Sequence, residues 1–243
     1  DDEKWIVSKE CVEKLEFFGK EVTIEGDING VEIIGKSAKA PHVEQEIPIL
    51  EAEFVESGIG TGLVMSVPAH APKDYQALMD LKSKNHELAS KIEPIPIIVT
   101  EGYGNIPAKD VCERLGVTDQ VDAKLEEATE ELYLKEFVNG KLNEKCGDFV
   151  NEKVEFGRNK VRDWLKDKNQ LEPFPTLQNA PIQCRCGCEC VVKVLNNQWF
   201  LNYGDEEWKK MARICLDSMN ILPNKIKTEF HDVINWLHER ACA

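Results

Sequence analysis

The chain has 243 residues, of which 42% are hydrophobic and 30% charged, and its formal net charge is −14. This length and composition allow a buried core without disulfide bonds, and no apolar run reaches the roughly 18 residues that a membrane span needs. The acidic balance excludes a freestanding, tight, non-specific nucleic-acid binder, which needs a basic face, but it allows RNA contact at one small pocket. The acidic N-terminus, DDEKWIVSKE, lacks the apolar core of a secretory signal.

The first quarter of the chain predicts mainly strands. Residues 5–7 favour a strand, and Ser8 then opens a short helix. Apolar and polar residues alternate in EVTIEGDINGVEIIG, and two further apolar runs, IPILEAEFVE and GLVMSV, follow it. We therefore expect a β-rich segment over residues 21–67.

Helices dominate after that point. Pro72 and Pro107 stand where first-turn helix prolines belong, and Gly116 ends the second of these helices. A cap at Thr118 or Asp119 opens a longer helix that stops near Gly140. Further helices are expected near 151–168, 205–219 and 223–242, and strands within 93–104 and 191–201. The class is α+β, a mixed β core with helices around it.

Nine cysteines divide into five scattered ones and a cluster of four within residues 184–190. An odd number with one tight cluster favours a reducing compartment and possible metal binding over a disulfide framework. The character of the chain changes near residue 178, so we predict one domain over 1–177 and a smaller cysteine-containing junction over 178–243.

The stretch from Gly60 to Tyr75, GTGLVMSVPAHAPKDY, carries the chemistry. Gly60 and Gly62 permit close backbone approach to a ligand. Asp74 falls in the first turn of the expected helix, where the helix dipole favours its ionised form, and such a carboxylate suits a substrate ammonium group. The plainer interpretation is a glycine turn and a favourable helix-terminal charge with no ligand.

This stretch resembles the editing domain (connective peptide 1) inserted into class I aminoacyl-tRNA synthetases for leucine, isoleucine and valine. The form SVPAHAP before the aspartate is most similar to archaeal/eukaryotic-type leucyl-tRNA synthetase. IPILEAEFV, NNQWFLNYGDEEWK and ILPNKIKTEFHDVINWLHERACA resemble other segments of that family in the same order. The resemblance implies a barrel-like mixed β core surrounded by helices.

The resemblance also implies a function, the hydrolysis of tRNA(Leu) mischarged with norvaline, isoleucine or similar amino acids. A second site is needed because one methylene changes binding by only about 1–3 kcal/mol. Asp74 would bind the α-ammonium group of the misattached amino acid. The adenosine and amino-acid side chain would contact a pocket wall made of Gly60, Thr61, Gly62, Val64, Met65 and Val67. His70 would either touch the substrate or make a structural hydrogen bond.

No covalent nucleophile is expected, since Ser66 lacks a GxSxG setting and no cysteine lies on this loop, so a positioned water remains as the attacking group. Editing itself requires no cofactor, whereas ATP and Mg²⁺ belong to the full-length enzyme. The expected partners are the 3′ end of tRNA(Leu), the mischarged amino acid and the rest of the synthetase chain, with no membrane. We expect a cytoplasmic location and a monomeric isolated domain.

Zinc is a further expectation, because sister enzymes hold it at a comparable junction. Cys184 and Cys186 are the preferred ligands, followed by Cys190. Zinc needs four tetrahedral ligands, usually as two pairs from separate segments, so a second pair could lie outside this chain.

Two family features are not found in the sequence: the threonine-rich strand that lines the editing pocket, and the HIGH and KMSKS signatures of the synthetic site. Both absences predict a part of a longer enzyme. Two alternatives stay open: the editing domain of a valyl- or isoleucyl-tRNA synthetase, and a non-enzymatic, zinc-stabilised interaction module.

Overall fold

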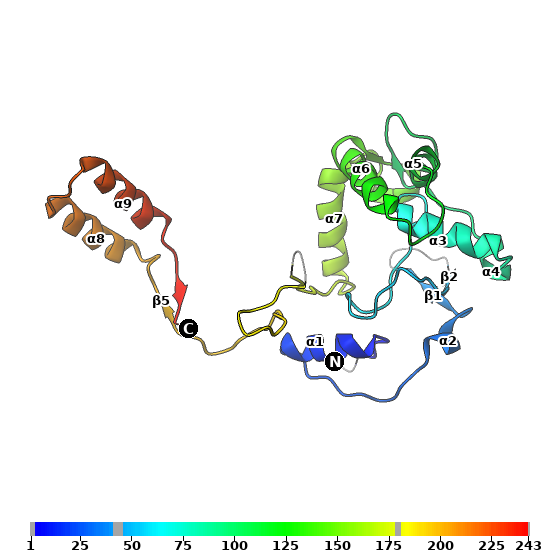
Figure 1. Ribbon diagram of the computed structural model, residues 1–243, viewed down its shortest axis with the longest axis horizontal. Coiled ribbons are helices and arrows are strands. Elements are labelled where there is room, and N and C mark those ends of the chain that lie inside the picture. Colours follow the sequence, from blue (N-terminus) through cyan, green and yellow to red (C-terminus); the bar gives the residue numbers. More distant parts are fainter. Residues whose placement is uncertain (1–2, 41–45, 178–180, 243) are drawn as a thin grey trace. The chain divides into compact units, whose positions relative to one another are not determined.

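The computed structural model describes residues 3–40, 46–177 and 181–242, and the chain divides into two compact units, Asp1–Val192 and Lys193–Ala243 (Figure 1). The helices of the first unit are α1 (Lys9–Phe17), α2 (Gly30–Ile33), α3 (Pro72–Ser83), α4 (Glu87–Ser90), α5 (Pro107–Leu115), α6 (Lys124–Asn139), the 3₁₀ helix η1 (Glu144–Phe149) and α7 (Val154–Asp167). Its strands form two antiparallel pairs, β1 (Ser37–Lys39) with β2 (Glu46–Pro48) and β3 (Ile98–Val99) with β4 (Lys141–Leu142).

The second unit is a helical hairpin, α8 (Glu206–Ser218) and α9 (Asn224–Trp236), which pack against each other (Figure 1). An antiparallel pair, β5 (Phe200–Leu201) with β6 (Arg240–Ala241), joins the two ends of this hairpin. The division of function after residue 177 stays a prediction. In neither unit is a described helix long and apolar enough to cross a membrane.

Local sequence signals place most helices correctly. The Ser8 hydroxyl accepts a hydrogen bond from the Cys11 amide at 3.2 Å and caps α1. Pro72 and Pro107 occupy first-turn positions, and Gly116 ends α5 with a φ of 64°, a left-handed value that glycine adopts without strain. These signals act within a few residues, so they can be recognised from the sequence without knowledge of the fold.

The helix expected from residue 119 begins later, at Lys124. Asp119 and Asp122 accept hydrogen bonds from backbone amides inside the turn, Asp119 from Val121 at 3.0 Å and Asp122 from Thr118 and Lys124 at 3.1 and 3.0 Å. These short side chains compete with helical hydrogen bonding and hold the turn open.

The prediction of a barrel-like β core is wrong for the described residues. Their strands form three separate two-stranded ladders. Residues 21–40 and 46–67 contain α2, β1 and β2 and are otherwise irregular, and Ile24, Ile28 and Val64 are 67%, 56% and 57% exposed. The strands expected at 5–7 and along 191–199 are also not formed. Strand propensity reflects packing against neighbouring strands, so an alternating sequence becomes a strand only where a partner supplies ladder hydrogen bonds.

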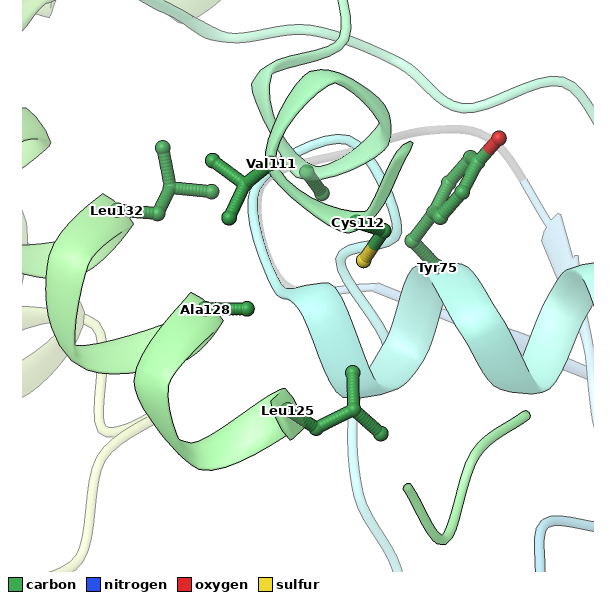
Figure 2. Close-up of a cluster of buried hydrophobic side chains, with 7 residues drawn as sticks. Tyr75, Val111, Cys112, Leu125, Ala128 and Leu132 are labelled. Atoms are coloured by element: carbon green, nitrogen blue, oxygen red, sulfur yellow. The ribbon is translucent and has the colours of Figure 1, made fainter. Parts of the chain in front are cut away.

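The core of the first unit lies between α3, α5 and α6 (Figure 2). It comprises seven buried residues: Tyr75, Ala108, Val111, Cys112, Leu125, Ala128 and Leu132. Burial raises the pKa of the Cys112 thiol to about 11, so this cysteine packs as a small apolar side chain. The core therefore fixes α3, and with it the loop that enters α3.

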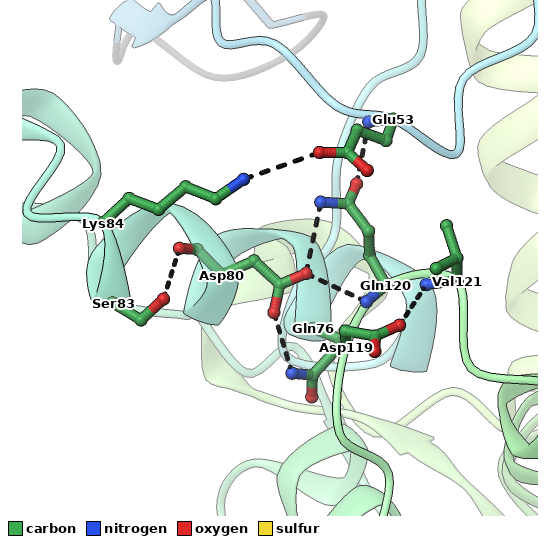
Figure 3. Close-up of polar contacts among 8 residues, drawn as sticks. All are labelled: Glu53, Gln76, Asp80, Ser83, Lys84, Asp119, Gln120 and Val121. Atoms are coloured by element: carbon green, nitrogen blue, oxygen red, sulfur yellow. Dashed lines mark hydrogen bonds and ion pairs between the residues drawn. The ribbon is translucent and has the colours of Figure 1, made fainter.

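A network of polar side chains attaches the segment around Glu53, which precedes α3 in the sequence, to that helix (Figure 3). Asp80 accepts hydrogen bonds from the Gln120 amide at 2.9 Å, the Gln120 side chain at 3.2 Å and the Gln76 side chain at 3.0 Å. The Gln120 side-chain oxygen accepts from the Glu53 amide at 2.8 Å. Gln120 thus links the segment that leads to Gly60 with the helix that carries Asp74.

The contribution of this core can be measured on α6. Leu132→Ala removes a fully buried side chain and is expected to lower the free energy of unfolding by about 2–5 kcal/mol. Leu134→Ala, on the same helix but 65% exposed, is the matched control and should change it by less than about 0.5 kcal/mol. Denaturant unfolding of the two variants compares them, and equal effects would contradict this placement of the core.

Candidate functional site

The Asp74 carboxylate lies buried at the head of α3. Asp74 is the third residue of that helix and is 7% exposed. Its Oδ2 accepts a hydrogen bond from the Val67 amide at 2.6 Å, which closes the loop 67–74 onto the helix. The loop therefore curls around the carboxylate and does not leave it in bulk solvent.

Burial makes the ionised form of the Asp74 carboxyl group less favourable. Desolvation raises the pKa of its carboxyl group, and hydrogen bonds from the Val67 amide and the Ser66 side chain only partly oppose this. Within the described part of the chain, no Lys, Arg or His nitrogen lies within 4.0 Å of this carboxylate. A buried carboxylate without a cation gains stabilisation when a cationic ligand arrives, so this arrangement favours an ammonium group.

His70 is fully engaged by the protein. It is 5% exposed, and its Nε2 accepts hydrogen bonds from the amides of Ile97 and Ile98 at 2.9 and 3.3 Å. Because those amides can only donate, the ring proton lies on Nδ1 and is donated to the carboxylate of Glu136, 2.7 Å away. Of the two roles expected for His70, the structure shows the structural hydrogen bonds.

The two glycines of the Gly60–Gly62 turn differ in what surrounds them. Both have left-handed φ values, 57° and 76°, but a Cβ on Gly60 would meet open space, whereas one on Gly62 would lie 2.5 Å from the Ser8 Cβ. The Ser8 amide donates to the Thr61 carbonyl at 2.7 Å, and the Ser8 hydroxyl donates to the Ser57 carbonyl at 2.7 Å. The close approach at Gly62 is thus made by the start of α1, and Gly60 is the glycine that leaves room for a ligand.

The apolar residues that are predicted to form the pocket wall after the glycine turn are exposed. Val64 and Met65 are each 57% exposed and Val67 is 36% exposed. The Thr61 hydroxyl is used locally, since it donates to the Leu63 carbonyl at 3.1 Å. The apolar side chains after the glycine turn are therefore free to contact a ligand.

Sequence reasoning missed Tyr133, on α6. It is 49% exposed, and its pKa is raised first by desolvation and then by the negative charges of Asp74 and Glu136. Its hydroxyl therefore lies within the electrostatic reach of Asp74. The sequence carries no signal for this, because Tyr133 stands 59 positions further along the chain, in a different helix.

The predicted zinc site does not fit the described cysteines. Cys184 and Cys186 form a disulfide bond, while Cys188 is an exposed free thiol and Cys190 a half-buried one. In the ranges that the structure describes, no group of three or more His, Cys, Asp or Glu residues is arranged to hold a metal ion. Two remaining thiols do not supply the four tetrahedral ligands of structural zinc.

The buried His70–Glu136 pair generates a stability prediction. His70→Ala leaves the buried Glu136 carboxylate without its donor and the Ile97 amide without its acceptor. We expect a loss of about 3–5 kcal/mol in the free energy of unfolding, measured by denaturant titration. His86→Ala is the control: it removes the cap that His86 provides for the Ala89 amide at 3.3 Å, typically worth about 1 kcal/mol, and a half-exposed contact of its Nε2 with the Glu51 carboxylate at 3.8 Å, which adds little. A loss of that smaller size at His70 would refute the structural role.

The glycine turn generates a second prediction. Gly60→Ala is expected to destabilise the chain by about 1–2 kcal/mol through its left-handed φ alone. Gly62→Ala adds a clash with Ser8 and should be clearly worse. In a Ser8→Gly background, which removes the clashing atoms, Gly62→Ala should fall to the level of Gly60→Ala; thermal unfolding of the four variants tests this. An unchanged Gly62→Ala effect would rule out the contact with Ser8.

Comparison with known proteins identifies the family. Residues 16–93, which include the glycine turn and Asp74, match the family model described as leucyl-tRNA synthetase, editing domain. The leucine–tRNA ligase of Methanococcus maripaludis strain C5 is 45% identical over 98% of this chain, and that of Methanocaldococcus jannaschii is 42% identical over 98%. The chain spans about a quarter of the length of these relatives, 25% in both cases.

Solved structures that are similar to this chain are also titled as leucyl-tRNA synthetase domains. The structure titled GlLeuRS-CP1 is similar with a TM-score of 0.61 at 27% identity, covering 71% of this chain and 70% of that one. The P. falciparum cytosolic leucyl-tRNA synthetase editing domain has a TM-score of 0.60 at 21% identity, over 67% of this chain and 58% of its own, and supports the fold. The glycine turn, the buried aspartate and these relatives together show that the chain belongs to the leucyl-tRNA synthetase family and corresponds to its editing region.

Proposed function

We propose that this chain hydrolyses the ester bond of tRNA(Leu) mischarged with norvaline, isoleucine or a similar amino acid, as the editing part of a leucine–tRNA ligase. The observation that carries the proposal is the buried carboxylate of Asp74, which has no cation beside it among the described residues. An aminoacyl ester presents an α-ammonium group, and this cation would form a charge-assisted hydrogen bond with that carboxylate.

The ammonium contact would position the substrate for reaction. The misattached amino acid is held at its α-ammonium group by Asp74, while the terminal adenosine and the amino-acid side chain lie along the exposed apolar segment 63–67. Gly60 leaves open space for the backbone to approach the ligand. Anchoring both ends of the ester lowers the entropic cost of attack on the carbonyl carbon between them.

Water is the nucleophile in this proposal. Its oxygen bonds to the ester carbonyl carbon, the bond from that carbon to the ribose oxygen breaks, and one proton of the water passes to the ribose oxygen. The products are the free amino acid and uncharged tRNA. The raised pKa of the nearby Cys112, about 11, keeps its thiol protonated, so this cysteine is not an activated nucleophile. The Ser66 side chain hydrogen-bonds to Asp74, whose carboxylate is assigned here to the ammonium group and not to a base.

Two other hypotheses gain less support. The identities of 42–45% are to leucine–tRNA ligases, which favours leucine over valine or isoleucine as the cognate amino acid. A zinc-stabilised interaction module would need a ligand set that the described cysteines do not form. The synthetic reaction with ATP and Mg²⁺ would belong to the other three quarters of the ligase.

Asp74→Asn tests the proposal within the whole ligase polypeptide. The asparagine oxygen still accepts the Val67 hydrogen bond, but the charge is lost. The loss of a charged hydrogen bond, about 2–3 kcal/mol, should slow deacylation of isoleucyl-tRNA(Leu) roughly 30- to 150-fold. Leucylation should be unchanged, and the exposed Asp27→Asn serves as the control. Undiminished deacylation by Asp74→Asn would exclude Asp74 as the ammonium ligand.

The same variant has a predictable effect on stability. Because the pKa of Asp74 is raised in the folded chain, the folded state binds more protons than the unfolded state between the two pKa values, and stability falls as pH rises through that window. At pH 7 Asp74→Asn should therefore melt at the same or a higher temperature than the native chain. Below the ordinary aspartate pKa of 3.8 this advantage should vanish. Lost activity with retained stability separates a binding role from a folding role.

A further inference from the structure

A depression on the β3–β4 side of the first unit has no role in the proposed ester hydrolysis. Its volume is about 460 Å³, and it is bounded by β4, η1 and the turn after η1. Val99 and Val150 form an apolar part of its surface and are 62% and 39% exposed. Lys141 and Lys145 stand at the same depression and are both exposed.

Hydrogen bonds of the backbone and of the Asn143 side chain hold this depression in shape. The β3–β4 ladder sets Val99 opposite Lys141. Asn143 donates from its amide to the Ile97 carbonyl at 2.9 Å and from its side chain to the Pro96 carbonyl at 2.8 Å. The Asn143 side-chain oxygen accepts from the Lys145 amide at 2.9 Å. The two lysines are thus attached to a fixed frame, which lowers the entropy lost when they engage a ligand.

The charge of this region is opposite to that of the chain. Residues 141–168 carry eight Lys and Arg and six Asp and Glu, a net charge of +2 in a chain of −14. Over the part that the structure describes, Lys160 forms an ion pair with Glu152, and the other seven cations have no carboxylate within 4.0 Å. Seven cations without a carboxylate partner give these residues a local positive charge in an acidic chain, which favours an anionic partner.

We propose that the depression between β4 and η1, with Lys141 and Lys145, binds the sugar–phosphate backbone of the RNA whose end is edited. Lysine ammonium groups neutralise phosphates, and the two valines offer apolar surface to a ribose or base edge. RNA is favoured over a small anion because the unpaired cations continue beyond the depression along α7. The inference rests on the proposed function, which supplies a tRNA as the partner.

The test measures tRNA(Leu) binding by the whole ligase as a function of salt. Lys141→Gln/Lys145→Gln removes two phosphate contacts and should lower the slope of log K against log salt by about 1.4–1.8. At 0.15 M salt this corresponds to a roughly 15- to 30-fold rise in Kd. The control is Lys36→Gln/Lys39→Gln, which makes the same charge change at two exposed lysines without ion pairs in the described structure, and should leave the slope unchanged.

Several outcomes separate this inference from the proposed function. An unchanged slope for Lys141→Gln/Lys145→Gln overturns the RNA site, even if the ligase deacylates normally. A reduced slope supports the site even if the ligase shows no deacylation, because binding is measured without hydrolysis. An equal loss in the Lys36/Lys39 control shows a general charge effect and also overturns the site. Millimolar inorganic phosphate that saturates the native depression, with no tRNA effect of the double variant, assigns it to a small anion and overturns the RNA proposal.

Discussion

The structure around residues 60–74 depends on one interaction, the hydrogen bond between the Val67 amide and the Asp74 carboxylate, 2.6 Å long. It folds the loop back onto the first turn of α3 and buries a negative charge there. Burial raises the pKa of this carboxyl group, and nothing positive among the described residues offsets the loss of hydration. The protein thus holds a carboxylate in an environment that an incoming ammonium group would improve.

The surrounding contacts make that position rigid. His70 ties the loop to β3 and to α6 through two backbone amides and Glu136. Gln120 and Asp80 tie the segment that contains Glu53 to α3 (Figure 3). For the proposed reaction rigid support would matter, because the ester would have to be held to within a fraction of an ångström for an unactivated water to attack.

Charge is distributed to match this chemistry. The chain as a whole carries a net charge of −14 and repels RNA, so contact with RNA is favoured only where the local charge is less negative. In the proposed function, the cationic run over 141–168 is one such place, and the Asp74 site would bind the single positive group of the aminoacyl ester. An acidic chain with a local cationic face would admit the end of a tRNA without holding the whole molecule, which would suit a site that must release its product.

The sequence by itself determined the helices with local signals, such as the Ser8 cap, the first-turn prolines and Gly116, and it singled out Asp74 and the glycine turn. These features depend on neighbours within a few residues, so no tertiary information is needed. Only the tertiary structure decided that Gly62 packs against Ser8, that His70 hydrogen-bonds to β3 and Glu136, and that the charge of Asp74 raises the pKa of Tyr133, because each interaction joins residues far apart in the chain. The prediction of a barrel-like β core was wrong for the same reason. A strand forms only through hydrogen bonds with a partner strand, and the alternation in residues 21–67 shows which faces are apolar but not whether a partner is present.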